Sequence, residues 1–188
     1  ERISHWLLAG SCLFCLFTGL GLMFRSWDFI PALLGGLYAL KWMHIFSGVA
    51  FAFALISAYL MWKKDCAFEP DDAKWIVQGG GYLWKTDKLP PDKYNAGQKL
   101  FFWFVVIFGA LIVLTGLVMW NPMAFPVAVA RWSYALHALS ALVIGSFFVV
   151  HLYLGTIGNP GTFQAMTTGL CTRAWCKTHC PRWLEDHY

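Results

Sequence analysis

The sequence has little charge. Only 13% of its 188 residues are Asp, Glu, Lys or Arg, whereas 59% are hydrophobic. Because soluble domains carry about 25% charged residues, this composition excludes an ordinary soluble protein and indicates a membrane protein. The sequence also lacks an internal repeat, a low-complexity segment and a basic stripe on a polar domain. Without such a stripe, the net charge of +4 does not indicate a nucleic-acid partner, and we expect none.

Four charge-poor runs are long enough to span a lipid bilayer. An α-helix needs about 20 apolar residues to cross a hydrocarbon core of about 30 Å. The runs lie near residues 4–24, 42–62, 100–120 and 133–157. They are continuous rather than alternating, so their backbone polar groups must be satisfied within helices. The sequence therefore predicts an all-α fold: one integral membrane four-helix bundle over residues 1–188.

The basic residues are unequally divided between the two sides of this bundle. Eleven lie on the side of the loop 63–99 and the tail 158–188, and only Arg25, Lys41 and Arg131 lie on the other. Cytoplasmic flanks carry the excess of Lys and Arg. We therefore expect the loop, the tail and both termini to be cytoplasmic. The first apolar run is longer than the apolar region of a secretory signal, so we expect it to be a membrane helix.

Four histidines lie within the apolar runs: His5, His44, His137 and His151. Histidine is costly in hydrocarbon, and neutral imidazole is a ligand of haem iron. The 14 residues from His137 to His151 make close to four turns, which places both on one helix face about 21 Å apart. Alternating helix directions put His44 at the depth of His137 and His5 at the depth of His151. The depths predict two haems, an outer one held by the first pair and an inner one held by the second.

Two axial histidines leave haem iron no open position, which suits electron transfer. The alternative is a cofactor-free membrane anchor or small transporter, in which the histidines are packed or carry protons. Two small residues favour the haems. Gly19 follows His5 by 14 residues, and Ala58 follows His44 by 14 residues. Each therefore lies on its histidine's face at the depth of the other haem, where it would leave room for a porphyrin edge.

The spacing of 39 residues from His5 to His44 and that of 14 from His137 to His151 occur together with three short sequence stretches. These are ERISHW at residues 1–6, KWMH at 41–44 and KYNAGQK at 93–99. With 39 residues from His5 to His44, the chain resembles the cytochrome b gamma subunits (cytochrome b556 type) of membrane-bound respiratory formate dehydrogenase-N over nearly its whole length. Histidine pairs alone also occur in the cytochromes b of hydrogenases and thiosulfate reductases.

The resemblance implies an electron-transfer subunit of an enzyme complex in the bacterial cytoplasmic (inner) membrane. An iron–sulfur beta subunit would deliver electrons from a molybdenum- or tungsten-containing catalytic alpha subunit to the outer of two b haems. The inner haem would reduce menaquinone or another quinone. The resemblance assigns His44 and His137 to the outer haem and His5 and His151 to the inner one, as depth does. A hydrogenase or another molybdenum or tungsten enzyme is the alternative complex.

The resemblance also implies a quinone site beside the inner haem, near the start of the third span. There, Asn95 and Gln98 are able to hydrogen-bond a quinone carbonyl, and Gly97 permits close approach. Residues 92–94 are candidates for supplying protons from the cytoplasm. The same segment also fits a helix start with Asn95 as N-cap, and the two interpretations are compatible.

The six cysteines fall into two groups. Cys12 and Cys15 have C-x-x-C spacing within an apolar helix, where they act as small hydrophobic residues. The other four share the cytoplasmic side and are Cys66, Cys171, Cys176 and Cys180. Four thiolates are able to hold zinc or an iron–sulfur cluster. The tail has no C-x-x-C pair, which favours reduced, free thiols.

Overall fold

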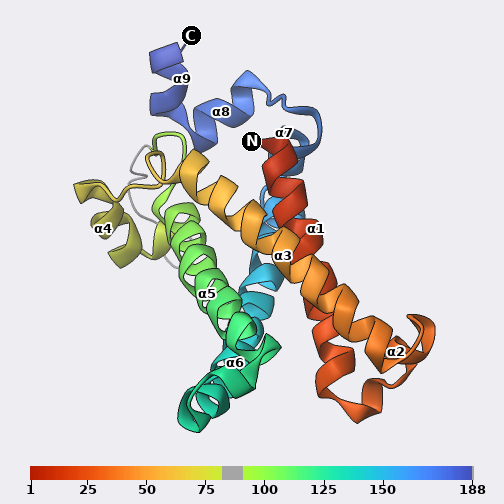
Figure 1. Cartoon of the computed structure of the whole chain (residues 1–188). Coiled ribbons are helices and arrows are strands. Elements are labelled where there is room, and N and C mark those ends of the chain that lie inside the picture. Colours follow the sequence, from red (N-terminus) through yellow and green to blue (C-terminus); the bar gives the residue numbers. More distant parts are fainter. Residues whose placement is uncertain (82–90, 188) are drawn as a thin grey trace. The chain divides into compact units, whose positions relative to one another are not determined.

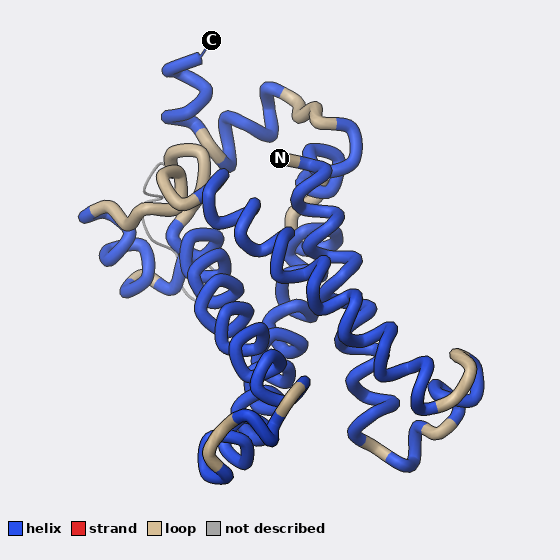
Figure 2. The backbone as a smooth tube through the Cα atoms, viewed as in Figure 1, coloured by secondary structure: helices blue, strands red, loops and turns tan. Residues whose placement is uncertain are grey.

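The computed structural model describes residues 1–81 and 91–187. Within these residues the chain consists of helices and loops, without strands (Figure 2). Two of the basic residues counted on the cytoplasmic side, Lys85 and Lys88, lie outside the described residues.

Four helices are long and apolar enough to cross a membrane (Figure 1). They are α1 (Arg2–Met23), α3 (Leu37–Trp62), α5 (Ala96–Trp120) and α6 (Val127–Tyr153), the last continued by a π-helix, Leu154–Gly158. The shorter helices are α2 (Phe29–Leu33), α4 (Pro70–Val77), α7 (Thr162–Thr168), α8 (Arg173–His179) and α9 (Pro181–His187). Single 3-10 turns lie at Arg25–Trp27, Gly79–Gly81 and Pro122–Ala124. The prediction of an all-helical fold with four apolar spans is confirmed.

All four spanning helices begin before their apolar runs, and the difference is largest for α3 and α6. α3 begins at Leu37 rather than near residue 42, and α6 begins at Val127 rather than near residue 133. The predicted runs were begun after Lys41 and Arg131, because these charged residues lower the local hydropathy. They do not interrupt the helical hydrogen bonds, because a long basic side chain extends from a helix toward the membrane interface.

Backbone features mark both of these starts. Gly36, with φ +94°, precedes α3, and its carbonyl accepts from the Leu40 N–H at 3.0 Å. Pro126 precedes α6, and its carbonyl accepts from the Ala130 N–H at 3.1 Å. The left-handed φ of Gly36 is incompatible with a regular α-helix, and Pro126 has no N–H to donate to a preceding helical turn. Each residue therefore fixes where its helix begins.

The described chain forms two compact units. The first comprises Glu1–Leu60 and Val106–Ser146, and the second comprises Met61–Val105 and Phe147–Tyr188. In the first unit the helices approach closely at small residues. A Cβ on Gly109 of α5 would lie 2.9 Å from Leu55 of α3, and the hydroxyls of Ser4 and Ser57 lie 3.2 Å apart between α1 and α3. Small residues at such contacts are typical of membrane helix packing.

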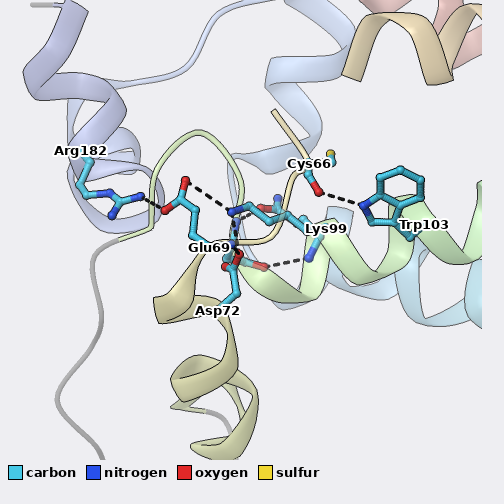
Figure 3. Close-up of polar contacts among 8 residues, drawn as sticks. Cys66, Glu69, Asp72, Lys99, Trp103 and Arg182 are labelled. Atoms are coloured by element: carbon cyan, nitrogen blue, oxygen red, sulfur yellow. Dashed lines mark hydrogen bonds and ion pairs between the residues drawn. The ribbon is translucent and has the colours of Figure 1, made fainter. Parts of the chain in front are cut away.

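In the second unit, ion pairs join α4 and α9 to the first turn of α5 (Figure 3). Lys99 is 2% exposed, and its Nζ lies 2.8 Å from Asp72 Oδ2 and 3.8 Å from Glu69 Oε1. Glu69 Oε2 accepts from Arg182 at 2.7 Å. Glu69 and Asp72 also form the capping box that begins α4. From the sequence, Lys99 is only one of the basic residues expected on the cytoplasmic side, whereas in the structure it is buried in this network.

Candidate functional site

His44 of α3 and His137 of α6 lie together in the first unit. Their ring centroids are 6.2 Å apart, with 63° between the ring planes. A metal–imidazole bond is about 2 Å long and each nitrogen lies about 1 Å from its ring centroid, so two imidazoles on one ion have centroids about 6 Å apart. The observed separation fits a single metal ion between the two rings.

The Thr18 hydroxyl determines which nitrogen of His44 carries the proton. Thr18 Oγ1 lies 2.9 Å from His44 Nδ1 and 2.7 Å from the carbonyl of Phe14. A carbonyl only accepts, so the hydroxyl proton goes to Phe14, and the hydroxyl oxygen accepts from the Nδ1–H of His44. The lone pair is then on Nε2, the nitrogen left for a metal ion.

His137 is held in the same way. Its Nδ1 lies 3.0 Å from the Ile112 carbonyl and 3.1 Å from Thr115 Oγ1. Because the carbonyl only accepts, Nδ1 must carry the proton and Nε2 the lone pair. Thr115 donates its own proton to the Leu111 carbonyl at 2.6 Å. Both histidines are therefore in the tautomer that binds metal through Nε2.

A glycine faces each of these rings. A Cβ on Gly19 would lie 3.4 Å from Cε1 of His44, and a Cβ on Gly116 would lie 3.4 Å from Cε1 of His137. Gly19 was predicted from the sequence, whereas Gly116 and both threonines were not. The available signal is a Thr-Gly dipeptide that occurs in α1 and again in α5, Thr18-Gly19 and Thr115-Gly116.

The two other histidines of the predicted set belong to different units. His5 lies in the first unit, with its ring edge-on to Trp6 at 5.0 Å between centroids. His151 lies in the second unit and stacks on Phe101 of α5, with centroids 4.4 Å apart and 4° between planes. The pairing of His5 with His151 therefore stays a prediction from their depth in the sequence.

Ala58 is 2% exposed within the first unit. Its neighbour Ser57 hydrogen-bonds Ser4, which directly precedes His5. The turn of α3 that carries Ala58 therefore lies beside the turn of α1 that carries His5.

Asn95, Gly97 and Gln98 form the start of α5. Asn95 Oδ1 accepts from the Gln98 N–H at 3.0 Å, and Gln98 Oε1 accepts from the Asn95 N–H at 2.9 Å. This reciprocal pair is a capping box, so the interpretation of the segment as a helix start is confirmed. A Cβ on Gly97 would lie 2.9 Å from the ring of Trp75, so α4 makes the close approach there. The caps use the amide oxygens and leave the two NH2 groups as donors.

The four cysteines outside the apolar spans all lie in the second unit. Cys171 Sγ lies 2.8 Å from Cys176 Sγ, and Cys180 also hydrogen-bonds Cys176. The hydrogen bond to Cys176, followed by burial, raises the pKa of Cys171 to about 11, and burial raises that of Cys66 to about 11. These two thiols are therefore protonated near neutral pH in the metal-free protein. Over residues 1–81 and 91–187, no group of three His, Cys, Asp or Glu side chains is placed to hold a metal ion.

Four apolar spans and a half-buried histidine pair, with both Nε2 lone pairs left for a metal ion, are the features of a membrane-spanning cytochrome of the b type. The chain belongs to the prokaryotic cytochrome b561 family, whose model matches residues 1–169.

Three curated relatives extend over nearly the whole chain. It is 31% identical over 190 residues to the "Formate dehydrogenase, cytochrome b556(fdo) subunit" of Escherichia coli (strain K12), covering 99% of this chain and 89% of that protein. It is 29% identical to the "Formate dehydrogenase, cytochrome b556 subunit" of Haemophilus influenzae, and the match covers 98% of this chain and 79% of that protein. It is 25% identical to the "Formate dehydrogenase, nitrate-inducible, cytochrome b556(Fdn) subunit" of Escherichia coli (strain K12), and the match covers 99% of this chain and 88% of that protein. The resemblance drawn from the sequence is confirmed.

A cytochrome b implies haem b, and the residues of the first unit fit that group. His44 and His137 have the centroid separation of two ligands on one iron and the correct tautomer. Gly19 and Gly116 keep side chains away from both rings. We name this set of residues the His44–His137 site.

Gly19→Leu should impair haem binding at the His44–His137 site, although Gly19 is nearer in sequence to His5. Extra side-chain volume 3.4 Å from the His44 ring must displace that ring, and overpacking of this kind typically costs about 1–3 kcal/mol. Haem quantitation and redox titration of the purified complex measure the loss. Gly10→Leu is the matched control, because a Cβ on Gly10 in the same helix meets nothing within 4 Å. Equal haem content and potentials in the two variants would contradict the assignment of Gly19.

Proposed function

We propose that this chain is the dihaem cytochrome b subunit of a formate dehydrogenase in the bacterial inner membrane. It passes electrons from an iron–sulfur subunit to menaquinone or another quinone. The observation that carries the proposal is the His44–His137 pair, which has the spacing and the tautomers of two axial ligands. A bound bis-histidine b haem supplies a one-electron carrier without an open coordination position.

The second haem is proposed from sequence depth and from the family resemblance. His5 and His151 would hold it as the inner haem, while His44 and His137 hold the outer one. Gly19 and Ala58 would make room for the two porphyrin edges. The burial of Ala58 and the Ser4–Ser57 hydrogen bond support this placement on the α1 and α3 side.

The proposed partners follow from the complexes in which the relatives are named. A catalytic alpha subunit with molybdenum or tungsten oxidises formate, and an iron–sulfur beta subunit brings the electrons to the outer side of this chain. The Lys and Arg distribution supports cytoplasmic termini, a cytoplasmic loop 63–99 and a cytoplasmic tail 158–188. The inner haem and the quinone would then lie on the cytoplasmic side, where protons are available.

The quinone is proposed to bind at the start of α5. Gln98 and Phe101 are three residues apart and therefore share a helix face, and Phe101 stacks on His151. The amides that cap α5 thus lie within about one helical turn of the proposed inner ligand. Their NH2 groups are the donors that a quinone carbonyl requires. Lys93 precedes Asn95 by two residues and pairs with Asp65 at 2.7 Å, which connects this segment to solvent-exposed charge.

Asn95→Asp and Gln98→Glu should each slow quinone reduction while both haems remain bound and reducible. A carboxylate preserves the oxygen that caps α5 but removes the NH2 donor. Losing one hydrogen bond costs about 0.5–1.5 kcal/mol, which is about a 2- to 10-fold reduction in turnover or quinone affinity. Haem reduction and quinol formation should be measured separately in the assembled complex.

The control for these variants is Gln78→Glu, the same chemical change at the end of α4. Alanine at residue 95 or 98 should reduce quinol formation as well, because it also removes the donor. If the Asp, Glu and Ala variants all form quinol at the normal rate over a range of quinone concentrations, the segment is only a helix start.

The proposal as a whole is tested by the optical spectrum of the purified complex. We expect reduced b-type bands at two haems per chain, with both haems reduced by formate. Reduction by hydrogen instead would identify a hydrogenase as the partner. A preparation of the intact complex without a Soret band would refute the cytochrome and support the cofactor-free anchor or transporter.

A further inference from the structure

The first unit contains the same polar arrangement twice. Thr18 of α1 and Thr115 of α5 are buried, 0% and 5% exposed, and each is followed by the glycine that faces a histidine ring. Each hydroxyl donates to the carbonyl four residues earlier in its own helix, at 2.7 and 2.6 Å. Each then accepts from Nδ1 of a histidine on the next spanning helix, at 2.9 and 3.1 Å.

We propose that Thr18 and Thr115 are positioning residues for the iron ligands His44 and His137, and that they set the redox potential of the haem held there. The inference rests on the proposed function, since it requires a haem between the two rings. It adds to that function the residues that fix the tautomer and orientation of each ligand.

The physical basis is the direction of the hydroxyl proton. Threonine in an apolar helix normally donates to its own helix, which here turns an oxygen lone pair toward the histidine. An acceptor at Nδ1–H keeps Nε2 unprotonated and increases the basicity of the imidazole. A more basic imidazole stabilises ferric over ferrous iron, so the hydroxyls lower the potential. Without its threonine hydroxyl, the Nδ1–H group of each histidine loses a hydrogen bond.

The two threonines should not contribute equally. For His137, the Ile112 carbonyl at 3.0 Å is a nearer acceptor than the Thr115 hydroxyl at 3.1 Å, so one acceptor remains when the hydroxyl is removed. For His44, the Thr18 hydroxyl at 2.9 Å is the nearest acceptor, and the ring has a secondary backbone interaction with Cys15. Removing the hydroxyl of Thr18 should therefore have the larger effect.

The test compares Thr18→Val, Thr18→Ser and Thr115→Val in the assembled complex. Valine keeps the shape of threonine without the hydroxyl, and serine keeps the hydroxyl. The readouts are the midpoint potential of each haem and the low-temperature EPR signal of the ferric haems, which reports the orientation of the ligand rings. Loss of a partner behind a ligating histidine typically weakens metal binding about 10-fold or more. A tenfold loss confined to the ferric state raises the potential by about 59 mV.

We expect Thr18→Val to raise the potential of one haem, Thr115→Val to raise the potential of the same haem by less, and Thr18→Ser to match the wild type. Loss of that haem in Thr18→Val together with its retention in Thr18→Ser would equally support a role for the Thr18 hydroxyl. Ser11→Ala is the control, because the Ser11 hydroxyl in the same helix donates to backbone carbonyls, to Leu7 at 2.7 Å and to Leu8 at 3.2 Å.

Three results would overturn the inference. An unchanged or lower potential in both valine variants would show that the hydroxyls do not act on the haem. An equal shift in Thr18→Ser and Thr18→Val would assign the effect to packing. A wild-type complex without haem would refute the proposed function itself, and this outcome is distinguished from the others because it appears before any variant is made.

Discussion

Replacing His44 or His137 with alanine removes one b haem from the complex and leaves the other in place. The two rings lie 6.2 Å apart, and in the proposed site their Nε2 atoms would hold one iron, so losing either ring would leave that iron with a single protein ligand. Haem content should fall from about two to about one per chain, with the disappearance of the same redox component in both variants. Pyridine haemochrome quantitation and redox titration measure the two effects.

The complementary variants are His5→Ala and His151→Ala, which should remove the other redox component. His179→Ala is the control, because its ring stacks on Trp175 and hydrogen-bonds that residue's carbonyl within α8. Disappearance of one and the same component from His44→Ala and His151→Ala would refute the pairing by depth. Retention of two haems in His44→Ala would refute the site.

Lys99→Met should destabilise the second unit by about 3–5 kcal/mol, because it removes one partner of a buried ion pair. Asp72 is 8% exposed and would keep a carboxylate without the ammonium 2.8 Å away. Part of the loss should appear in quinol formation, since Lys99 lies in the turn of α5 next to Gln98. The temperature at which the purified complex loses monodispersity and bound haem measures the destabilisation.

An exposed ion pair on α4 provides the matched control. Lys74 and Asp71 are 3.2 Å apart, with side chains 68% and 52% exposed, so Lys74→Met should cost no more than about 1 kcal/mol. Adding Asp72→Asn to Lys99→Met should recover much of the stability, because the buried charge is removed while the cap of α4 keeps an acceptor. Equal shifts in Lys99→Met and Lys74→Met would show that the buried pair has no special role.

The histidine pair could be predicted from sequence because depth is a one-dimensional property in a membrane. Once four apolar runs are recognised and their directions alternate, the distance of His44 and His137 from the ends of their runs places them at one level. Their threonine partners could not be predicted in this way. In an apolar helix, a threonine that only bonds its own backbone has the same sequence pattern as Thr18 or Thr115.

The ion network and the tail helices depend on contacts that leave no local pattern. Lys99 is paired with residues that precede it by 27 and 30 positions, and Arg182 joins from the end of the chain. Helices of seven residues, such as α8 and α9, are unstable alone and form where they pack. Here Cys176, Cys180 and Leu184 make a small buried cluster.

The duplicated arrangement of threonine, glycine and histidine divides the proposed haem site between two helical hairpins. The hairpin of α1 and α3 holds one complete ligand with its hydroxyl and its glycine, and the hairpin of α5 and α6 holds the other. Neither hairpin alone offers an iron two axial bonds. Cofactor insertion and hairpin association are therefore thermodynamically linked, so that each strengthens the other. Chains made faster than haem is supplied would lack this link between the hairpins, so we expect them to be less stable than the haem-loaded protein.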